Sequence, residues 1–460
     1  MTSASKVRHD TRESVPDSVD AWRRLLVSLV LMTIGGSGMY AVVVVLPSVQ
    51  AEFGVERAGA SLPYTMTMIG FGLGGIVMGR LADRFGVMVP VIVGSLSLGV
   101  GFTAASMASS LWQFTLAQGL LIGLLGSSAT FAPLVADASL WFDRRRGIAV
   151  AICASGNYLG GAVWPPIIQH FVETVGWRQA YAGVGVVCVL TMLPLAFALR
   201  RRPPALGPAP EPEPATVNAA AQPGTAAAAA PSAQTVSVPA AARVPATPST
   251  AATAAPRDRS RPLGLSPGAL QTLLSVAGVS CCVAMSMPQV HIVAYCGDLG
   301  YGPARGAQML SLMLGFGIVS RLLSGMITDR IGGLRTLLLG STLQTIALAL
   351  FLPFDSLSSL YLISALFGLF QGGIVPSYAI IVRQYFSPQE AGARVGTVLT
   401  ATLLGMALGG WLSGKIFDIT GSYHAAFLNG IGWNLVNLAI VGLLIMRARP
   451  GRLAGAPAPG

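Results

Sequence analysis

Arg321 lies within a long run of uncharged residues at about 306–327. A lone charged side chain inside hydrocarbon costs about 3 kcal/mol on insertion scales, so such a residue usually faces a cavity and binds something there. No Asp or Glu is clearly placed at the same depth to neutralise it. A carboxylate ligand could supply the missing charge through two parallel hydrogen bonds to the planar guanidinium. The alternative is that Arg321 extends its charged head to the membrane surface.

Several other polar side chains interrupt the apolar runs and could line a cavity with Arg321. The candidates are Tyr40, Asn157, His291, Gln371 and Tyr378, together with Arg146 at the inner end of its run, where it could receive a departing anion. Hydrogen bonds between neighbouring helices would explain these residues equally well. If a proton is involved, the available groups are His291, His170 and Asp137, and a histidine titrates near neutral pH.

The elements that must position these residues are membrane-spanning helices. Hydrophobic residues make up 53% of the 460 residues, charged residues make up 10%, and the mean hydropathy is +0.66. In lipid only helices or closed barrels satisfy their backbone internally, and the alternating ten-residue segments of a barrel are missing. We therefore predict an all-α membrane protein with twelve transmembrane helices, at about 25–49, 60–79, 88–109, 111–136, 147–172, 179–199, 269–296, 306–327, 334–354, 358–382, 392–414 and 425–446.

Basic residues gather on one side of the predicted spans. If the N-terminus is cytoplasmic, 24 of the 29 Lys and Arg residues fall in cytoplasmic segments. The other five are Arg57, Arg178, Arg305 and Lys415 on the outside and Arg321 within a span. The positive-inside rule then predicts that both termini are cytoplasmic. The net charge of +11 follows from this topology, and no aromatic-interleaved basic patch indicates a nucleic-acid partner.

Composition divides the chain into a cytoplasmic N-terminal tail at 1–23, a six-helix bundle at 24–200, a linker at 201–267, a second six-helix bundle at 268–446 and a cytoplasmic C-terminal tail at 447–460. The linker is rich in Ala and Pro, which predicts a disordered cytoplasmic tether, with a regulatory docking segment as the alternative. No cleaved leader is expected, because the first apolar run is too long for a signal-peptide core. The five cysteines have no metal-ligand spacing, so we expect no metal site. We also expect no cofactor, and we expect the protein to be a monomer.

Two segments of the chain repeat each other. Segment 79–86, Gly-Arg-Leu-Ala-Asp-Arg-Phe-Gly, follows the second span and recurs after the eighth as 325–332, Gly-Met-Ile-Thr-Asp-Arg-Ile-Gly, at an offset of 246. The pair 141–142, Trp-Phe, corresponds to 385–386, Tyr-Phe, at an offset of 244. Near-constant offsets at matching places indicate a duplicated six-helix unit, and hence two pseudo-symmetric bundles.

Segment 79–86 resembles the signature loop of the major facilitator superfamily between its second and third helices. The copy at 325–332 stands where that superfamily keeps a degenerate second loop, and the resemblance extends over all twelve spans. It implies a secondary carrier that works by alternating access, in which the two halves rock around a midplane site. Charged residues of the two loops would then stabilise one closed state, and these gate residues are Arg80, Asp83, Arg84, Asp329 and Arg330.

A narrower resemblance is carried by two further segments. Segment 141–151, Trp-Phe-Asp-Arg-Arg-Arg-Gly-Ile-Ala-Val-Ala, with the later pair Gly160 and Gly161, is similar to the entry of the fifth helix in monocarboxylate and oxalate/formate transporters. Segment 291–301, followed by Arg321-Leu-Leu-Ser-Gly, is similar to the seventh and eighth helices of bacterial members of that group. The resemblance implies a small organic anion as substrate, a proton or counter-anion as the coupled ion where there is one, and a bacterial inner membrane.

The sequence also departs from this group. The animal monocarboxylate transporters carry a Lys in the first helix, whereas the first span here has no Lys. They also carry an Asp four residues before the eighth-helix Arg, and the residue four before Arg321 is Gly317. The oxalate/formate antiporters use a Lys within the eleventh helix, whereas Lys415 lies at the outer end of that span. The known proton relay therefore does not transfer, and a singly charged acid is favoured over oxalate.

Other functions are weighed against a carrier of monocarboxylate-like anions. A major facilitator exporter of drugs or hydrophobic compounds would be favoured by carboxylates inside the membrane and by a Gly-Pro pair in the fifth helix, where this chain has Gly160 followed by Gly161. A non-transporting membrane sensor would need a folded signalling domain, which the composition of the linker and tail does not predict. No nucleophile triad, phosphate loop or metal cluster indicates an enzyme.

Overall fold

Every regular element is a helix in the computed structural model, which describes residues 16–201 and 262–448. The tail at 1–15, the linker at 202–261 and the tail at 449–460 lie outside the described residues. Twelve of the described helical segments are long and apolar enough to cross a membrane. The predicted all-α membrane fold with twelve spans is therefore confirmed.

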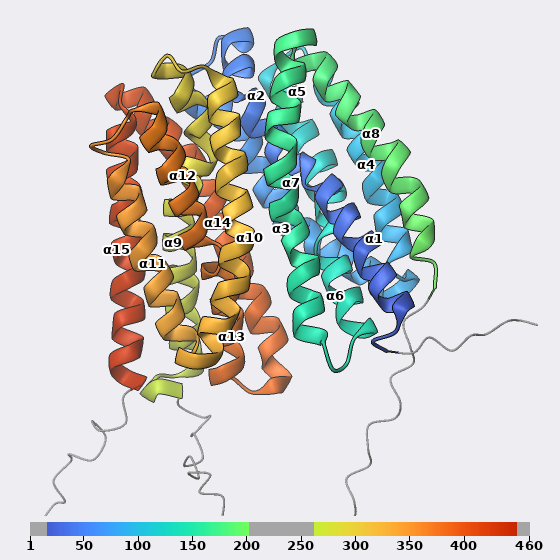
Figure 1. The fold of residues 1–460 in the computed structure, drawn as a ribbon, viewed down its shortest axis with the longest axis vertical. Helices are drawn as coiled ribbons and strands as arrows, with labels where there is room; N and C mark the ends of the chain where they lie inside the picture. The colour runs from blue at the N-terminus through green and yellow to red at the C-terminus, as the bar shows by residue number, and fades with distance from the viewer. Residues whose placement is uncertain (1–15, 202–261, 449–460) are drawn as a thin grey trace, which may run out of the picture. The chain divides into compact units, whose positions relative to one another are not determined.

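The first six spans contain ten helical elements (Figure 1). They are α1 (Val19–Gly35) and α2 (Ser37–Phe53) in one span, α3 (Arg57–Phe85), α4 (Met88–Ser106), a fourth span of α5 (Leu111–Leu116), η1 (Ala117–Gly126), η2 (Ser127–Thr130) and α6 (Ala132–Trp141), then α7 (Arg146–Val175) and α8 (Trp177–Ala198). The last six spans follow the short turn η3 (Pro262–Gly264). They are α9 (Pro267–Asp298), α10 (Pro303–Ile331), α11 (Gly333–Leu350), α12 (Leu357–Gln371) with α13 (Ile374–Tyr385), α14 (Pro388–Thr420) and α15 (Tyr423–Ala448).

Most of the helices start a few residues earlier than hydropathy predicts, and among these α1 and α9 begin with a serine cap. α1 begins at Val19, because the Ser18 hydroxyl accepts a hydrogen bond from the Ala21 N–H at 3.3 Å and so caps the helix. Residues 20–24, three of which are charged and which the sequence places largely in the N-terminal tail, therefore form the first helical turns. Likewise, Ser266 caps α9, and residues 262–267 at the end of the predicted linker are ordered. Hydropathy misses the start of α1 because its first turns carry Asp20, Arg23 and Arg24, and it places the start of α9 only two residues late.

Glycines interrupt two of the spans where other helices approach closely. The first span is interrupted at Gly36, where a Cβ would lie 3.3 Å from the Gly160 Cα of α7. The tenth span breaks at Gly372 and Gly373, where a Cβ would overlap Gly317 and Ser324 of α10. Small residues at these contacts let the helix backbones pack closely, as is common between helices in membranes.

The described residues of both halves belong to one compact unit. Across the halves, α10 packs along α7, and α14 packs along α3. Within the second half, α9 is the most buried helix, because α14, α15 and α10 all pack against it. Side chains on α7 and α10, and on α3 and α14, can therefore meet between the halves.

The two repeated loops have the same geometry in the structure. α3 ends at Gly86 and α10 ends at Gly332, each with φ of 84°, a left-handed value that favours glycine. Each glycine N–H donates to a carbonyl four residues earlier at 2.8 Å. We call the end of the bundle where these loops lie the Asp83 end. The opposite end, where α3 begins, is called the Arg57 end.

Candidate functional site

Arg321 extends from α10 of the second half to α7 of the first. Its Nη1 donates a hydrogen bond to the Ala154 carbonyl oxygen at 3.0 Å, and its guanidinium carbon lies 4.5 Å from the centre of the Tyr158 ring. Its Nε is buried and has no hydrogen-bond partner. Within 16–201 and 262–448, no carboxylate forms a salt bridge with Arg321. Arg321 is thus a half-buried cation, held by a carbonyl and an aromatic face, with donors left over.

Two tyrosines from the first half lie near Arg321: Tyr158 contacts it, and Tyr40 is close enough to interact electrostatically with its charge. Tyr158 fills the space above Gly317 of α10, where any Cβ would overlap its ring, and Tyr40 lies over Gly161 of α7, where a Cβ would be 2.7 Å from its Cζ. Each tyrosine is only 8% exposed. The group of Tyr40, Tyr158 and Arg321 is therefore assembled from α2, α7 and α10, and the two glycines make room for it.

This group has the chemistry of an anion site. A guanidinium carries five N–H donors in one plane, and Arg321 uses one of them on Ala154. A buried donor without a partner costs free energy, about 1–3 kcal/mol, which an incoming acceptor would recover. Two adjacent donors match the two oxygens of a carboxylate.

The remaining cavity candidates are dispersed. Gln371 of α12 accepts a hydrogen bond from Gln289 of α9 at 2.9 Å, and its own amide nitrogen is buried without a partner. Tyr378 donates to Asn437 at 3.0 Å inside the second half, away from α7. Asn157 is half-buried on α7, next to Tyr158 in sequence. The structure thus brings Tyr40 together with Arg321 and gives Tyr378 a separate partner.

Charged candidates at the Asp83 end are exposed. Arg146 begins α7, and its Nε donates to the Phe142 carbonyl at 3.2 Å. The five predicted gate residues, Arg80, Asp83, Arg84, Asp329 and Arg330, are also exposed. In the described part of the chain none of these five forms a salt bridge with the other half, and Arg84 lies over the neighbouring Phe85 ring at 5.1 Å. The role of these five residues as a gate stays a prediction about a state in which the Asp83 end is closed.

The opposite end of the bundle is held by a charged cluster that the sequence did not single out. Arg57 of α3 is 7% exposed, and its Nη2 contacts both carboxylate oxygens of Asp298 at 3.1 Å. Its Nη1 donates to the Tyr423 hydroxyl at 3.0 Å, and Asp418 accepts from the N–H groups of Arg57 and Ala58 at 2.8 Å each. We call Arg57, Asp298, Asp418 and Tyr423 the Arg57 cluster.

The Arg57 cluster joins the start of α3 to three helices of the second half, α9, α14 and α15. A weaker pair, Lys415 with Glu56 at 3.5 Å, lies alongside it. In the sequence, Arg57 stood out only as one of four basic residues on the predicted outer side. The sequence nevertheless contained a signal for this cluster, since Asp298 and Asp418 lie at the ends of two spans of the second half on the same side as Arg57.

An ion pair in which both partners are buried lies inside the first half. Arg24 of α1 contacts Asp137 of α6 through Nε at 2.7 Å and Nη2 at 2.9 Å, and Nη2 also donates to the Leu199 carbonyl at 3.1 Å. Both side chains are only 6% exposed, and Arg24 lies 4.7 Å from the centre of the Trp141 ring. Asp137, which the sequence offered as a proton carrier, is thus engaged by a permanent cation.

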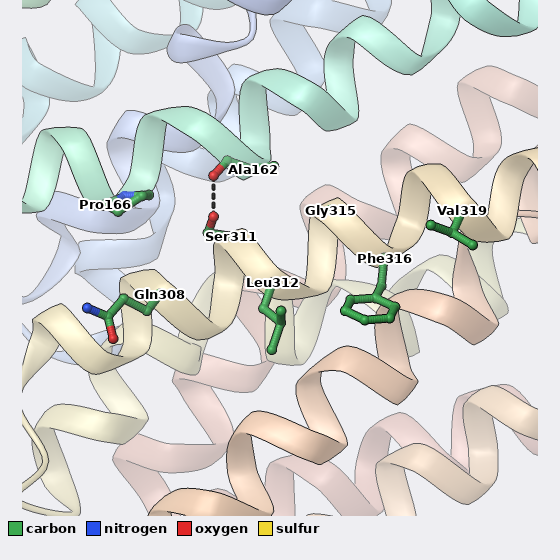
Figure 2. A pocket seen from close by; sticks show the side chains of 8 residues that line it. All are labelled: Ala162, Pro166, Gln308, Ser311, Leu312, Gly315, Phe316 and Val319. Carbon is green, nitrogen blue, oxygen red and sulfur yellow. Dashed lines mark hydrogen bonds between the residues drawn. The ribbon is translucent and has the colours of Figure 1, made fainter.

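A separate hollow of about 420 Å³ lies between α7 and α10 (Figure 2). In Figure 2, Ser311 of α10 points to the Ala162 carbonyl of α7 and donates a hydrogen bond to it, while Leu312, Phe316 and Val319 point away from α7. None of the eight described residues that line this hollow is charged. It is therefore distinct from the Arg321 group, which lies on the same two helices nearer the Asp83 end.

The family model of the Major Facilitator Superfamily matches residues 26–363 and 274–460. The chain belongs to this superfamily. This facilitator is 23% identical over 379 residues to the MFS-type transporter pynF of Aspergillus niger, with 81% of this chain and 75% of that protein covered. It is 27% identical over 363 residues to monocarboxylate transporter 13 of Bos taurus, with 77% and 73% covered. It is accordingly a transporter of small molecules in a lipid bilayer and not an enzyme.

Solved structures show the same fold. The nucleoside transporter NupG superposes on this facilitator with a TM-score of 0.65 at 12% identity, covering 94% of this chain and 100% of that one. A bacterial homologue of the human lysosomal transporter Spinster, inward-facing and occupied, superposes with a TM-score of 0.62 at 13% identity, covering 94% and 98%. The Arg57 cluster and the Arg321 group thus both lie between the two halves of a major facilitator fold.

Proposed function

We propose that this facilitator moves a small organic anion of the monocarboxylate type across the membrane, and that Arg321 binds its carboxylate. The observation that carries the proposal is the buried, unpartnered Nε of Arg321 beside Tyr40 and Tyr158, with no acidic residue paired to it in the described ranges. A small carboxylate would neutralise the guanidinium and accept its free donors. The similarity to monocarboxylate transporter 13 supports the same substrate class.

The transport mechanism we propose is alternating access. The Arg57 cluster closes one end of the seam between the halves, while the charged loops at the Asp83 end are exposed and make no salt bridge across it in the described residues. With both termini cytoplasmic, as the basic residues predict, the Arg57 end faces outward. We infer a monomer in a bacterial inner membrane, closed to the outside in this state, with tails and linker on the cytoplasmic side.

An exporter of cationic compounds is the competing function. It would need a free carboxylate where the substrate binds, to balance the positive charge. The most deeply buried carboxylate of the described residues, Asp137, is paired with Arg24 instead. The Arg321 group offers a cation, which repels a cationic drug. These charges favour the anion carrier.

A ligand-binding experiment tests the proposal. The purified full-length protein is heated with monocarboxylates, dicarboxylates and cationic drugs, and the unfolding temperature is recorded. A ligand at 100 times its Kd stabilises the native state by about 2.7 kcal/mol. We expect monocarboxylates to raise the unfolding temperature of the wild type but not of Arg321→Gln. Arg305→Gln is the matched control, because Arg305 is an exposed arginine on the same helix.

Each result has a separate meaning. Stabilisation by monocarboxylates that survives in Arg321→Gln would keep the substrate class and reject Arg321 as its site. Stabilisation by cationic drugs alone would reject monocarboxylates as the substrate class. Arg321→Lys adds a test of geometry, since it keeps the charge but loses the planar fork, and we expect it to bind the acid more weakly than the wild type does.

A further inference from the structure

His291 is fully buried in α9, one to two helical turns before Asp298 of the Arg57 cluster. Its Nε2 lies 2.8 Å from the Gly410 carbonyl oxygen of α14, and its Nδ1 lies 3.3 Å from the Tyr423 hydroxyl of α15. The Tyr423 hydroxyl in turn accepts a hydrogen bond from Arg57 at 3.0 Å. A continuous line of polar contacts therefore runs from α3 of one half to a histidine inside the other.

The partners of His291 determine where its proton lies. A carbonyl oxygen can only accept, so Nε2 must carry the hydrogen that bonds Gly410. In the neutral ring Nδ1 is then an acceptor, and the Tyr423 hydroxyl donates to it while accepting from Arg57. In this arrangement the Tyr423 hydroxyl and both ring nitrogens of His291 each have a matching partner, whereas the Arg57 Nε has none. The neutral ring is thus the form that fits the closed Arg57 cluster.

A second proton on His291 would break this match. With Nδ1 protonated, the Tyr423 oxygen would face two cationic donors, His291 and Arg57, and its own hydrogen would lose its acceptor. Of the nearby carboxylates, Asp298 already contacts the Arg57 side chain. Asp418 keeps its negative charge while it binds the backbone at the start of α3, and it offsets only part of the repulsion from Arg57.

The rest of the surroundings add no compensating charge. Tyr295, on the same helix, contacts the Tyr423 ring, and Tyr64 of α3 lies against Gly410, but both are neutral phenols. No hydrogen bond or ring contact joins His291 to α2, α10 or α13, which also pack against α9, in the ranges described above. A buried cation next to Arg57 would consequently destabilise the closed cluster.

We propose that His291 is a proton-binding site whose occupancy is linked to the state of the Arg57 cluster. The ring is neutral while α3 is held against α9, α14 and α15. When the cluster parts, water reaches Nδ1 and the ring takes up one proton, and reclosing returns that proton to water. By linkage, the state that binds the proton more tightly is favoured at acid pH, so acid favours the parted state. The inference rests on the alternating access of the proposed function and makes the balance between its two states depend on pH.

The test measures the opening of the Arg57 end without any substrate. Spin labels are placed on Ser109→Cys and Ser358→Cys of the full chain, which are exposed in the two halves at this end, while the five native cysteines are buried. Distances between the labels are measured by pulsed electron resonance at pH 8 and pH 5. A histidine in water titrates near pH 6.5, so the ratio of parted to closed molecules should rise about 30-fold.

Three variants decide the outcome. His291→Gln keeps a donor for Gly410 and an acceptor for Tyr423 but cannot charge, so we expect it to lose the pH response. His424→Gln removes an exposed histidine one residue from Tyr423, and we expect it to keep the response. Tyr423→Phe retains His291 but removes the hydroxyl between it and Arg57, so we expect a parted population already at pH 8.

Two results would overturn the proposal. One is an unchanged distance distribution for the wild type at the two pH values. The other is a response that persists in His291→Gln. Should His291→Gln not fold, the wild type, Tyr423→Phe and His424→Gln still test the link. Because no acid is added, failure here leaves the Arg321 site standing, and loss of acid binding in the thermal experiment leaves the proton link standing.

Discussion

Asp418 caps the helix that begins at Arg57 from the opposite half of the molecule. Its carboxylate accepts hydrogen bonds from the N–H groups of Arg57 and Ala58 at 2.8 Å each, whereas the residue at the cap position, Glu56, makes no side-chain capping bond. The free N–H groups at a helix start carry partial positive charge, so an acidic partner stabilises them. Closing the Arg57 end therefore completes a helix cap, and parting it leaves that cap unmade.

We expect Asp418→Asn to weaken this closed state. The amide keeps one acceptor oxygen, loses the negative charge and cannot hold both N–H groups as a carboxylate does, which should cost the closed state about 1 kcal/mol. The label distances between positions 109 and 358 should shift toward longer values at pH 8. Asp355→Asn is the control, because Asp355 is an exposed acid at the same end. Equal shifts in both variants would contradict the capping role.

The pair of Arg24 and Asp137 predicts a large and specific loss of stability. Asp137→Ala leaves the Arg24 guanidinium buried without its counter-charge, and breaking a buried pair in this way costs about 3–5 kcal/mol. The double variant Arg24→Leu, Asp137→Leu should lose less, because no charge stays buried. Thermal unfolding of the purified protein measures both.

The control for this pair is Arg23→Ala. Arg23 is largely exposed and contacts Asp20 at 3.6 Å, a surface pair that should change stability by less than about 1 kcal/mol. A double variant as unstable as Asp137→Ala would show that the loss comes from packing and not from the unpaired charge.

The glycine opposite Tyr158 predicts a change in binding. In Gly317→Ala the new methyl group would overlap the Tyr158 ring and push it away from Arg321, since overpacking a tight contact typically costs about 1–3 kcal/mol. We expect at least about a tenfold weaker affinity for a monocarboxylate, because about 1.4 kcal/mol corresponds to a factor of ten. Gly325→Ala on the same helix is the control, as its Cβ would meet nothing within 4 Å. Wild-type affinity in Gly317→Ala would contradict the arrangement.

Asp17 ties the start of α1 to the loop before α7. Its carboxylate accepts hydrogen bonds from the N–H groups of Arg144 at 3.0 Å and Asp143 at 3.3 Å, and these bonds, that of Arg144 first, lower the pKa of Asp17. A lowered pKa in the folded state means that the contact stabilises the fold above about pH 4, the usual range of an aspartate, and is lost as the pH falls below it.

Removing the Asp17 charge should therefore expose the loop at neutral pH. Asp17 has a φ of 56°, which Asn also adopts readily, so Asp17→Asn changes the charge with little backbone strain. We expect faster trypsin cleavage after Arg144 and Arg145 in native vesicles, while Asp20→Asn, an exposed acid nearby, should leave the rate unchanged. Equal cleavage rates for Asp17→Asn and the wild type would argue that other contacts hold the loop.

The sequence alone was enough to predict the twelve spans and the duplicated loops, because both depend on local pattern. Lipid demands about twenty apolar residues in each helix, and a tight helix end demands glycine, as Gly86 and Gly332 show with their common φ of 84°. Arg321 was likewise identifiable from the sequence, since a single charged residue in an apolar run is a local feature that does not depend on tertiary contacts.

The tertiary structure alone decided which charges meet. Arg24 and Asp137 are 113 residues apart, and Arg57 and Asp298 are 241 apart, so no local period connects them. The sequence assigned Arg24 to a cytoplasmic flank, offered Asp137 as a proton carrier and left Arg57 outside the site. Helix packing gave each of the three a partner that the sequence did not predict, because the depth and direction of a charged side chain depend on where its helix is capped and on which glycines let a neighbouring helix approach.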